Sequence, residues 1–144
     1  MQYEDFDVSI EATSGRAYRV AVLHSPAGQA HETVTFPFDT VALQLHLTQL
    51  ENALLKSGGS RRRVPGKEEK AVLAFGQALF NFLMHGEVGQ RYAVSYDRCQ
   101  QASKGLRLKL RIQDPVLAAL PWEFLYDQRF DHYLALSQRT PLLR

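Results

Sequence analysis

The sequence predicts an α+β domain in which strands, then helices, then strands follow one another along the chain. In the first forty residues and again at residues 106–112, apolar and polar residues alternate, as in a strand with one buried face. Between these two regions the apolar residues recur every three or four positions, which is the spacing of an amphipathic helix. Because strands and helices do not alternate regularly, this order favours one helical layer packed on a mainly antiparallel sheet.

The amino-terminal part is predicted to form a three-stranded antiparallel meander. The first strand covers residues 6–12, and the turn residues 13–15 join it to a second strand at residues 18–22. A third run at residues 32–38 is rich in Thr, Val and Phe. It ends near Pro37, which cannot donate to a β-ladder and therefore suits a strand end or an edge.

About three amphipathic helices are predicted to follow. The first begins at the capping pair Asp39-Thr40, and the second runs from about Lys67 until Gly86 interrupts it. The third follows Gly89 and ends near Gly105, where glycine fits a helix C-cap. Their core-facing stripes are Leu43, Leu47, Leu50 and Leu54 in the first, Val72, Phe75, Leu79 and Phe82 in the second, and Val88, Tyr92, Tyr96 and Cys99 in the third.

The carboxy-terminal part begins with the clearest strand of the chain, at residues 106–112. Asp114 and Pro115 then provide an N-cap and a first-turn proline for a short helix at residues 116–120. Two short strand-like runs follow at residues 133–136 and 140–143. A chain that stops on an apolar strand leaves an unpaired edge, so we expect this chain to be part of a longer one.

Composition excludes several classes of protein. The chain has 144 residues, which is the length of one domain, and its 45% hydrophobic and 22% charged residues are typical of a folded globular protein. A single cysteine, Cys99, excludes an internal disulfide, so we expect a cytoplasmic protein. There is no apolar run of signal-peptide or membrane-span type. A net charge of +2 names no partner.

The residue types suggest catalytic and metal-binding sites, but the spacing of these residues in the sequence argues against such sites. If residues 85–99 form one helix, His85 and Cys99 lie about 21 Å apart, too far for a nucleophile and its base. The five histidines, His24, His31, His46, His85 and His132, lack metal-ligand spacing. The Ser57-Gly58-Gly59-Ser60 segment lacks the Lys-Ser/Thr of a phosphate loop. We therefore predict no catalytic residue, metal or cofactor site in this chain.

A basic surface is the candidate for nucleic-acid binding. It would combine Arg61, Arg62 and Arg63 with the polar face of the strand at residues 106–112, which carries Arg107, Lys109 and Arg111. Exposed aromatic residues that would stack on bases are missing around both clusters. Nucleic-acid binding is therefore the least favoured of the three functions that we consider for this chain.

Five sequence segments are informative when they are taken together. They are Ser25-Pro26-Ala27-Gly28, Pro37-Phe38-Asp39, Gly105-Leu106-Arg107-Leu108, Leu120-Pro121-Trp122-Glu123-Phe124-Leu125-Tyr126-Asp127, and Leu134-Ala135-Leu136-Ser137 with Thr140-Pro141-Leu142-Leu143-Arg144. In this order they resemble the opening portion of a CHAT domain, a caspase-like domain of bacterial proteins that also carry tetratricopeptide repeats and that are similar to separase.

The resemblance implies the amino-terminal, non-catalytic lobe of a cysteine peptidase. In that family the catalytic His and Cys lie beyond the segment matching Thr140 to Arg144, so no catalytic residue is carried over. Trp122, Phe124, Leu142 and Leu143 are the expected seam with the peptidase core or a second copy, and repeat-domain contacts are a further expectation. The alternative is a stand-alone protein–protein interaction module that pairs through its terminal strand.

Overall fold

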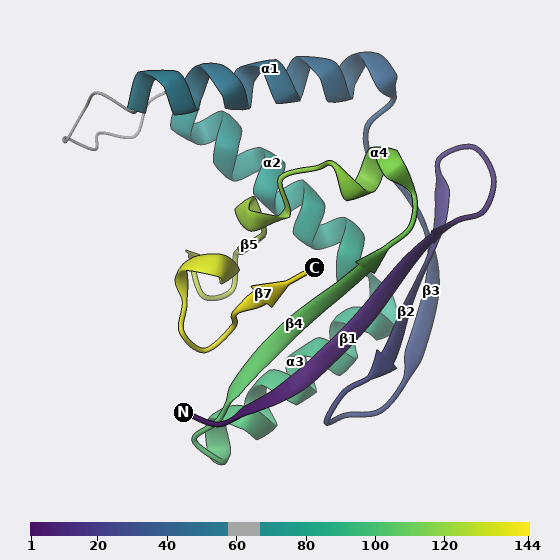
Figure 1. The fold of residues 1–144 in the computed structure, drawn as a ribbon, viewed down its shortest axis with the longest axis vertical. Helices are drawn as coiled ribbons and strands as arrows, with labels where there is room; N and C mark the ends of the chain where they lie inside the picture. Colours follow the sequence, from purple (N-terminus) through teal and green to yellow (C-terminus); the bar gives the residue numbers. More distant parts are fainter. Residues whose placement is uncertain (58–66) are drawn as a thin grey trace.

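The computed structural model describes residues 1–57 and 67–144, and they form an α+β structure (Figure 1). Its centre is a five-stranded sheet in the order β3-β2-β1-β4-β7. A separate two-stranded hairpin, β5-β6, lies in the carboxy-terminal part. The predicted fold class is confirmed.

The amino-terminal meander is confirmed. β1 (Tyr3–Ala12), β2 (Ala17–His24) and β3 (Ala30–Thr35) are joined by antiparallel pairing of β1 with β2 and of β2 with β3. β3 ends two residues before Pro37, because the proline cannot extend the ladder.

The other half of the sheet is parallel, whereas the sequence favoured a mainly antiparallel sheet. β4 (Gly105–Ile112) pairs in parallel with β1, and β7 (Leu142–Leu143) pairs in parallel with β4. The intervening helices return the chain to the starting end of β1 before β4 begins. Such a crossover is what a parallel pairing requires.

Within residues 1–57 and 67–144, four helices connect these strands. They are α1 (Thr40–Ser57), α2 (Lys67–Leu83), α3 (Gly86–Gln101) and the short α4 (Pro115–Ala118). The predicted caps are present: Asp39 Oδ1 accepts a hydrogen bond from the Ala42 amide at 2.8 Å, and Asp114 Oδ2 accepts one from the Leu117 amide at 3.0 Å. Leu54, predicted to face the core, is 53% exposed near the end of α1.

Helix α3 differs from its prediction at both ends. It begins at Gly86 rather than beyond Gly89, and its left-handed terminal residue is Ser103, with φ of 56°, rather than Gly105. Gly105 instead opens β4, where an added Cβ would overlap the ring of Tyr3. Glycine is needed there for close packing and not for a cap.

The carboxy-terminal segment contains a hairpin that the sequence did not predict. β5 (Tyr126–Asp127) pairs antiparallel with β6 (His132–Tyr133), and residues 134–136, predicted as strand, form the 3₁₀ turn η2 (Leu134–Leu136). A second 3₁₀ turn, η1 (Trp122–Phe124), precedes the hairpin. Runs this short take their conformation from tertiary contacts rather than from propensity.

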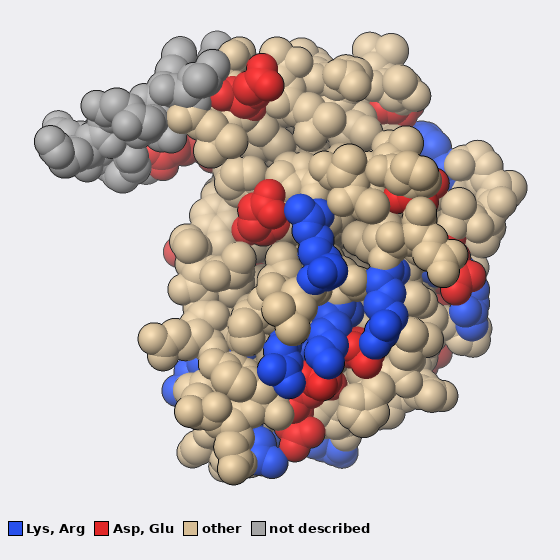
Figure 2. Space-filling view, in the orientation of Figure 1, with Lys and Arg blue, Asp and Glu red and all other residues tan. Residues whose placement is uncertain are grey.

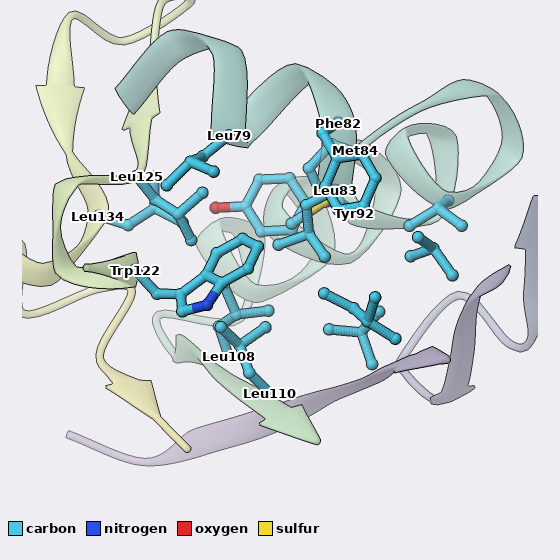
Figure 3. Close-up of a cluster of buried hydrophobic side chains, with 14 of the residues drawn as sticks. Leu79, Phe82, Leu83, Met84, Tyr92, Leu108, Leu110, Trp122, Leu125 and Leu134 are labelled. Carbon is cyan, nitrogen blue, oxygen red and sulfur yellow. The ribbon is translucent and has the colours of Figure 1, made fainter. Parts of the chain in front are cut away.

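The buried apolar side chains form one continuous cluster between the helices and one face of the sheet. Helix α3 lies across that face (Figure 1) and contributes Tyr92, while α2 contributes Leu79 and Leu83. Trp122 packs among these helices and β4 (Figure 3). In the described part of the chain, no helix combines the length and apolar character that crossing a membrane requires.

Candidate functional site

The sheet face opposite α3 carries a ladder of paired charges (Figure 2). In the parallel register of β1 and β4, Asp5 lies opposite Arg107 and Asp7 lies opposite Lys109. The Asp5 carboxylate accepts a hydrogen bond from Arg107 Nε at 2.7 Å and lies 3.1 Å from Lys109 Nζ. Arg111 Nη2 lies 3.6 Å from Asp7 Oδ2.

This pairing concerns the three cations that β4 contributes to the predicted basic surface. The hydrogen bond from Arg107, followed by the one from Lys109, lowers the pKa of the Asp5 carboxyl below its usual value, against the opposing effect of burial. The three cations of β4 thus lie within 3.6 Å of two carboxylates of β1. Arg61, Arg62 and Arg63, the other half of the predicted surface, lie outside the described residues.

Asp5 and Asp7 were not singled out from the sequence. A signal was present, because acidic side chains alternate with apolar ones in β1 in the same way that basic side chains do in β4. Opposite charges on neighbouring strands pair across the sheet. Using that signal requires knowing that β1 and β4 are neighbours, although the 92 residues from 13 to 104 lie between the end of β1 and the start of β4.

The residues of the predicted seam differ in their exposure. Trp122 is fully buried, and its indole Nε1–H donates to the Leu117 carbonyl at 2.7 Å. Phe124 and Leu142 are half-buried, and Leu143 is 47% exposed on β7. Within this chain, Leu143 is therefore the member that presents the most surface to a partner.

The strand β7 is fixed by hydrogen bonds from segments far apart in the sequence. The amides of Leu106 and Leu108 donate to the carbonyls of Arg139 and Pro141 at 2.7 and 2.8 Å. At the end of the chain, the Arg144 guanidinium donates to the Leu120 carbonyl at 2.8 Å and lies 3.6 Å from the Glu123 carboxylate. These contacts hold the last residues against α4 and η1.

The buried polar residues of the same region also have structural partners. Thr140 Oγ1 donates to the Leu134 carbonyl at 2.9 Å, and the Leu134 amide donates to the Leu125 carbonyl at 3.0 Å. The buried carboxylate of Asp127 accepts hydrogen bonds from the Arg129 amide and guanidinium, which closes the turn between β5 and β6. This hydrogen bond raises the pKa of the Arg129 guanidinium.

His85 and Cys99 lie at opposite ends of α3. His85 is its N-cap residue, and Cys99 lies near its last turn, so the continuous helix separates them by about 21 Å. Cys99 is 3% exposed, and burial raises the pKa of its thiol. Among residues 1–57 and 67–144, no three His, Cys, Asp or Glu side chains come together as a metal site.

His85 instead contributes to a hollow of about 560 Å³ between β3 and the end of α2. On the strand side the hollow is bordered by Thr33, Thr35 and Pro37, and on the helix side by Ala78, Asn81 and Phe82. This hollow could not be predicted from the sequence, because it depends on where α2 ends relative to the edge of the sheet.

Comparisons with protein families, with curated proteins and with solved structures found no match to this chain.

Proposed function

We propose that this chain is the amino-terminal, non-catalytic lobe of a cytoplasmic CHAT-type cysteine peptidase of bacteria, and that it supports a peptidase core with which it shares its sheet. The proposal starts from the sequence resemblance. It is supported by how the residues of that resemblance are used in this structure.

The supporting observation is that four of the resembling segments interlock with one another. Residues 105–108, 120–127, 134–137 and 140–144 are separate in the sequence, yet each is hydrogen-bonded to another of the set through the contacts of Leu108, Leu134, Thr140 and Arg144. Their combined effect is to hold β7 in parallel with β4. These residues therefore have a structural role, which agrees with a supporting lobe rather than a catalytic one.

The strand β7 is suited to continue the sheet. Within the described residues it has β4 as its one neighbour, so its other edge has backbone groups available for a further strand. Leu143 adds an exposed apolar side chain beside that edge. Addition of a parallel strand from a peptidase core would bury both.

The first test is the reading frame that encodes this chain. We expect it to continue past Arg144 into a segment with a His-Gly pair and a later cysteine. A stop codon directly after Arg144 would contradict the proposal.

The second test measures the cleavage of casein by the longer protein that the continued reading frame would encode. Replacing the cysteine of the continuation with Ala should abolish cleavage, whereas Cys99→Ala should retain it. Leu143→Asp should reduce cleavage by disturbing the junction, and Leu136→Asp is its matched control because Leu136 is 82% exposed and outside β7. Equal activity of the two leucine variants would argue against a junction at β7.

A stand-alone protein–protein interaction module is the second candidate. The same observation favours it, namely the exposed side chain of Leu143 on the edge strand β7. In that case two copies of the chain would pair through β7. Sedimentation should then show a concentration-dependent dimer of the 144-residue chain that Leu143→Asp dissociates and Leu136→Asp does not. A monomer at all concentrations would exclude it.

A further inference from the structure

The outer edge of β3 has backbone groups that face away from the sheet. The Phe36 amide donates to the Arg16 carbonyl at 2.8 Å, which makes these two residues a hydrogen-bonded pair of the antiparallel ladder. Because such pairs alternate, the backbone N–H and C=O groups of Thr33 and Thr35 point away from β2. Among the described residues, no hydrogen bond to either threonine is made from this outer side.

The hollow beside this edge has an apolar floor. Phe82 and Val34 are both buried at its base, and Ala78 leaves room because its side chain is small. A strand added along β3 would direct every second side chain into the hollow. A volume of about 560 Å³ lies within the range of ligand-binding pockets.

The charge around the hollow favours a basic residue on such a strand. Helix α2 ends here at Leu83 with no basic residue in its last turn, so the negative end of its dipole is not compensated by its own side chains. Glu32, the neighbour of Thr33, adds a carboxylate next to the hollow but outside its lining, at the start of α3, where it accepts a hydrogen bond from the Glu87 amide. In the described part of the chain, no Lys or Arg lines the hollow.

We propose that the outer edge of β3 and this hollow bind an extended segment of a partner polypeptide by strand addition. The segment would carry apolar residues at alternate positions and a Lys or Arg that reaches the end of α2. Backbone hydrogen bonds would supply affinity, and the hollow would supply selectivity. This inference does not rest on the proposed peptidase lobe, because β3 and β7 are opposite edges of the sheet.

The test is a selection of random ten-residue peptides displayed on phage against the 144-residue chain. We expect the selected peptides to share alternating apolar residues and one basic residue. Titration of the best peptide into ¹⁵N-labelled protein should shift the amide signals of Thr33, Thr35, Asn81 and His85. Absence of selected binders, or shifts confined to another surface, would overturn the proposal.

Two substitutions test the two parts of the site. Ala78→Trp fills the hollow and should weaken binding of the selected peptide at least about tenfold. Ala74→Trp is the matched control, because Ala74 is exposed one turn earlier on α2 and does not line the hollow. Thr33→Pro removes an outward N–H without breaking the ladder and should weaken binding at least about threefold.

A backbone-modified peptide provides a control that leaves the protein unchanged. The selected peptide, N-methylated at alternate residues, keeps its side chains but cannot donate to the edge of β3, and we expect it to lose binding. Equal binding of the N-methylated and unmodified peptides, or equal binding to the Ala78→Trp and Ala74→Trp proteins, would show that strand addition at this site is wrong.

Discussion

Asp5 lies between Arg107 and Lys109 on the charged sheet face, and its ionisation is linked to folding. Its carboxyl pKa is lower in the folded protein than the value of about 3.9 expected for the unfolded chain, chiefly because Arg107 donates a hydrogen bond to it. The stabilisation from a lowered acid pKa is complete above the unfolded value and is lost as the pH falls through the folded value.

We predict that Asp5→Asn lowers the free energy of unfolding by about 0.5 to 1 kcal/mol at about pH 7. The difference from the unsubstituted protein should shrink as the pH falls below the unfolded pKa and through the lower folded pKa of Asp5, because the carboxyl is then protonated in the folded and the unfolded states alike. Urea unfolding at a series of pH values measures this. Glu11→Gln, on the same strand, is the control, and a difference that grows on acidification would contradict the assignment.

Cys99 is the residue whose chemistry is most clearly suppressed by its surroundings. Burial raises the pKa of its thiol, so at about pH 8 the group stays protonated and is shielded from reagents. We predict that Ellman's reagent modifies Cys99 at least about 100-fold more slowly in the native protein than in urea. Rapid, complete modification of the native protein would show that the thiol is accessible and would reopen a catalytic role.

At the scale of elements, the packing of α2 against η1 depends on Gly76. A Cβ added at this position would overlap the backbone carbonyl oxygen of Phe124, so glycine permits the helix and the 3₁₀ turn to touch. Two effects of a substitution therefore oppose each other. Helix propensity favours Ala over Gly by about 1 kcal/mol, whereas overpacking against backbone costs about 1 to 3 kcal/mol or more.

We predict that overpacking is the larger effect and that Gly76→Ala destabilises the protein by about 1 to 2 kcal/mol. Ala74→Gly, at an exposed position of the same helix, should also destabilise it, by about 1 kcal/mol, through propensity alone. Thermal and urea unfolding measure both variants. A stabilised Gly76→Ala protein would mean that α2 and η1 are not in close contact.

At the scale of the whole molecule, the sheet, the helices and the carboxy-terminal segment share one apolar cluster. Trp122 connects the carboxy-terminal segment to the sheet and the helices, because it is fully buried among side chains of α2, α3 and β4 (Figure 3). A shared core makes separate unfolding of any layer unfavourable, since the unfolding of one layer would expose the apolar surface that it covers on the others.

We predict a single cooperative unfolding transition in urea. Far-ultraviolet circular dichroism, which follows helices and strands, and the fluorescence of Trp122, which follows the carboxy-terminal packing, should give the same midpoint. Two separated midpoints would show that the segment around Trp122 folds independently of the sheet.

Much of the local structure could be predicted from the sequence. The alternation around Phe6 and Leu108 and the stripe of Phe75 and Leu79 identify strands and helices, because each pattern reflects a side chain that must be buried on one face. The capping residues Asp39 and Asp114 mark helix starts for an equally local reason, since they bond to amides three residues along the chain.

The candidate sites could not be predicted, because they depend on which segments become neighbours. The parallel placement of β4 beside β1 brings Asp5 to Arg107, and the end of α2 beside β3 creates the hollow at Thr33. The sequence by itself therefore determined the order and type of the main elements. Only the tertiary structure decided which charges are compensated and which sheet edge borders a hollow, since both are properties of residues distant in the chain.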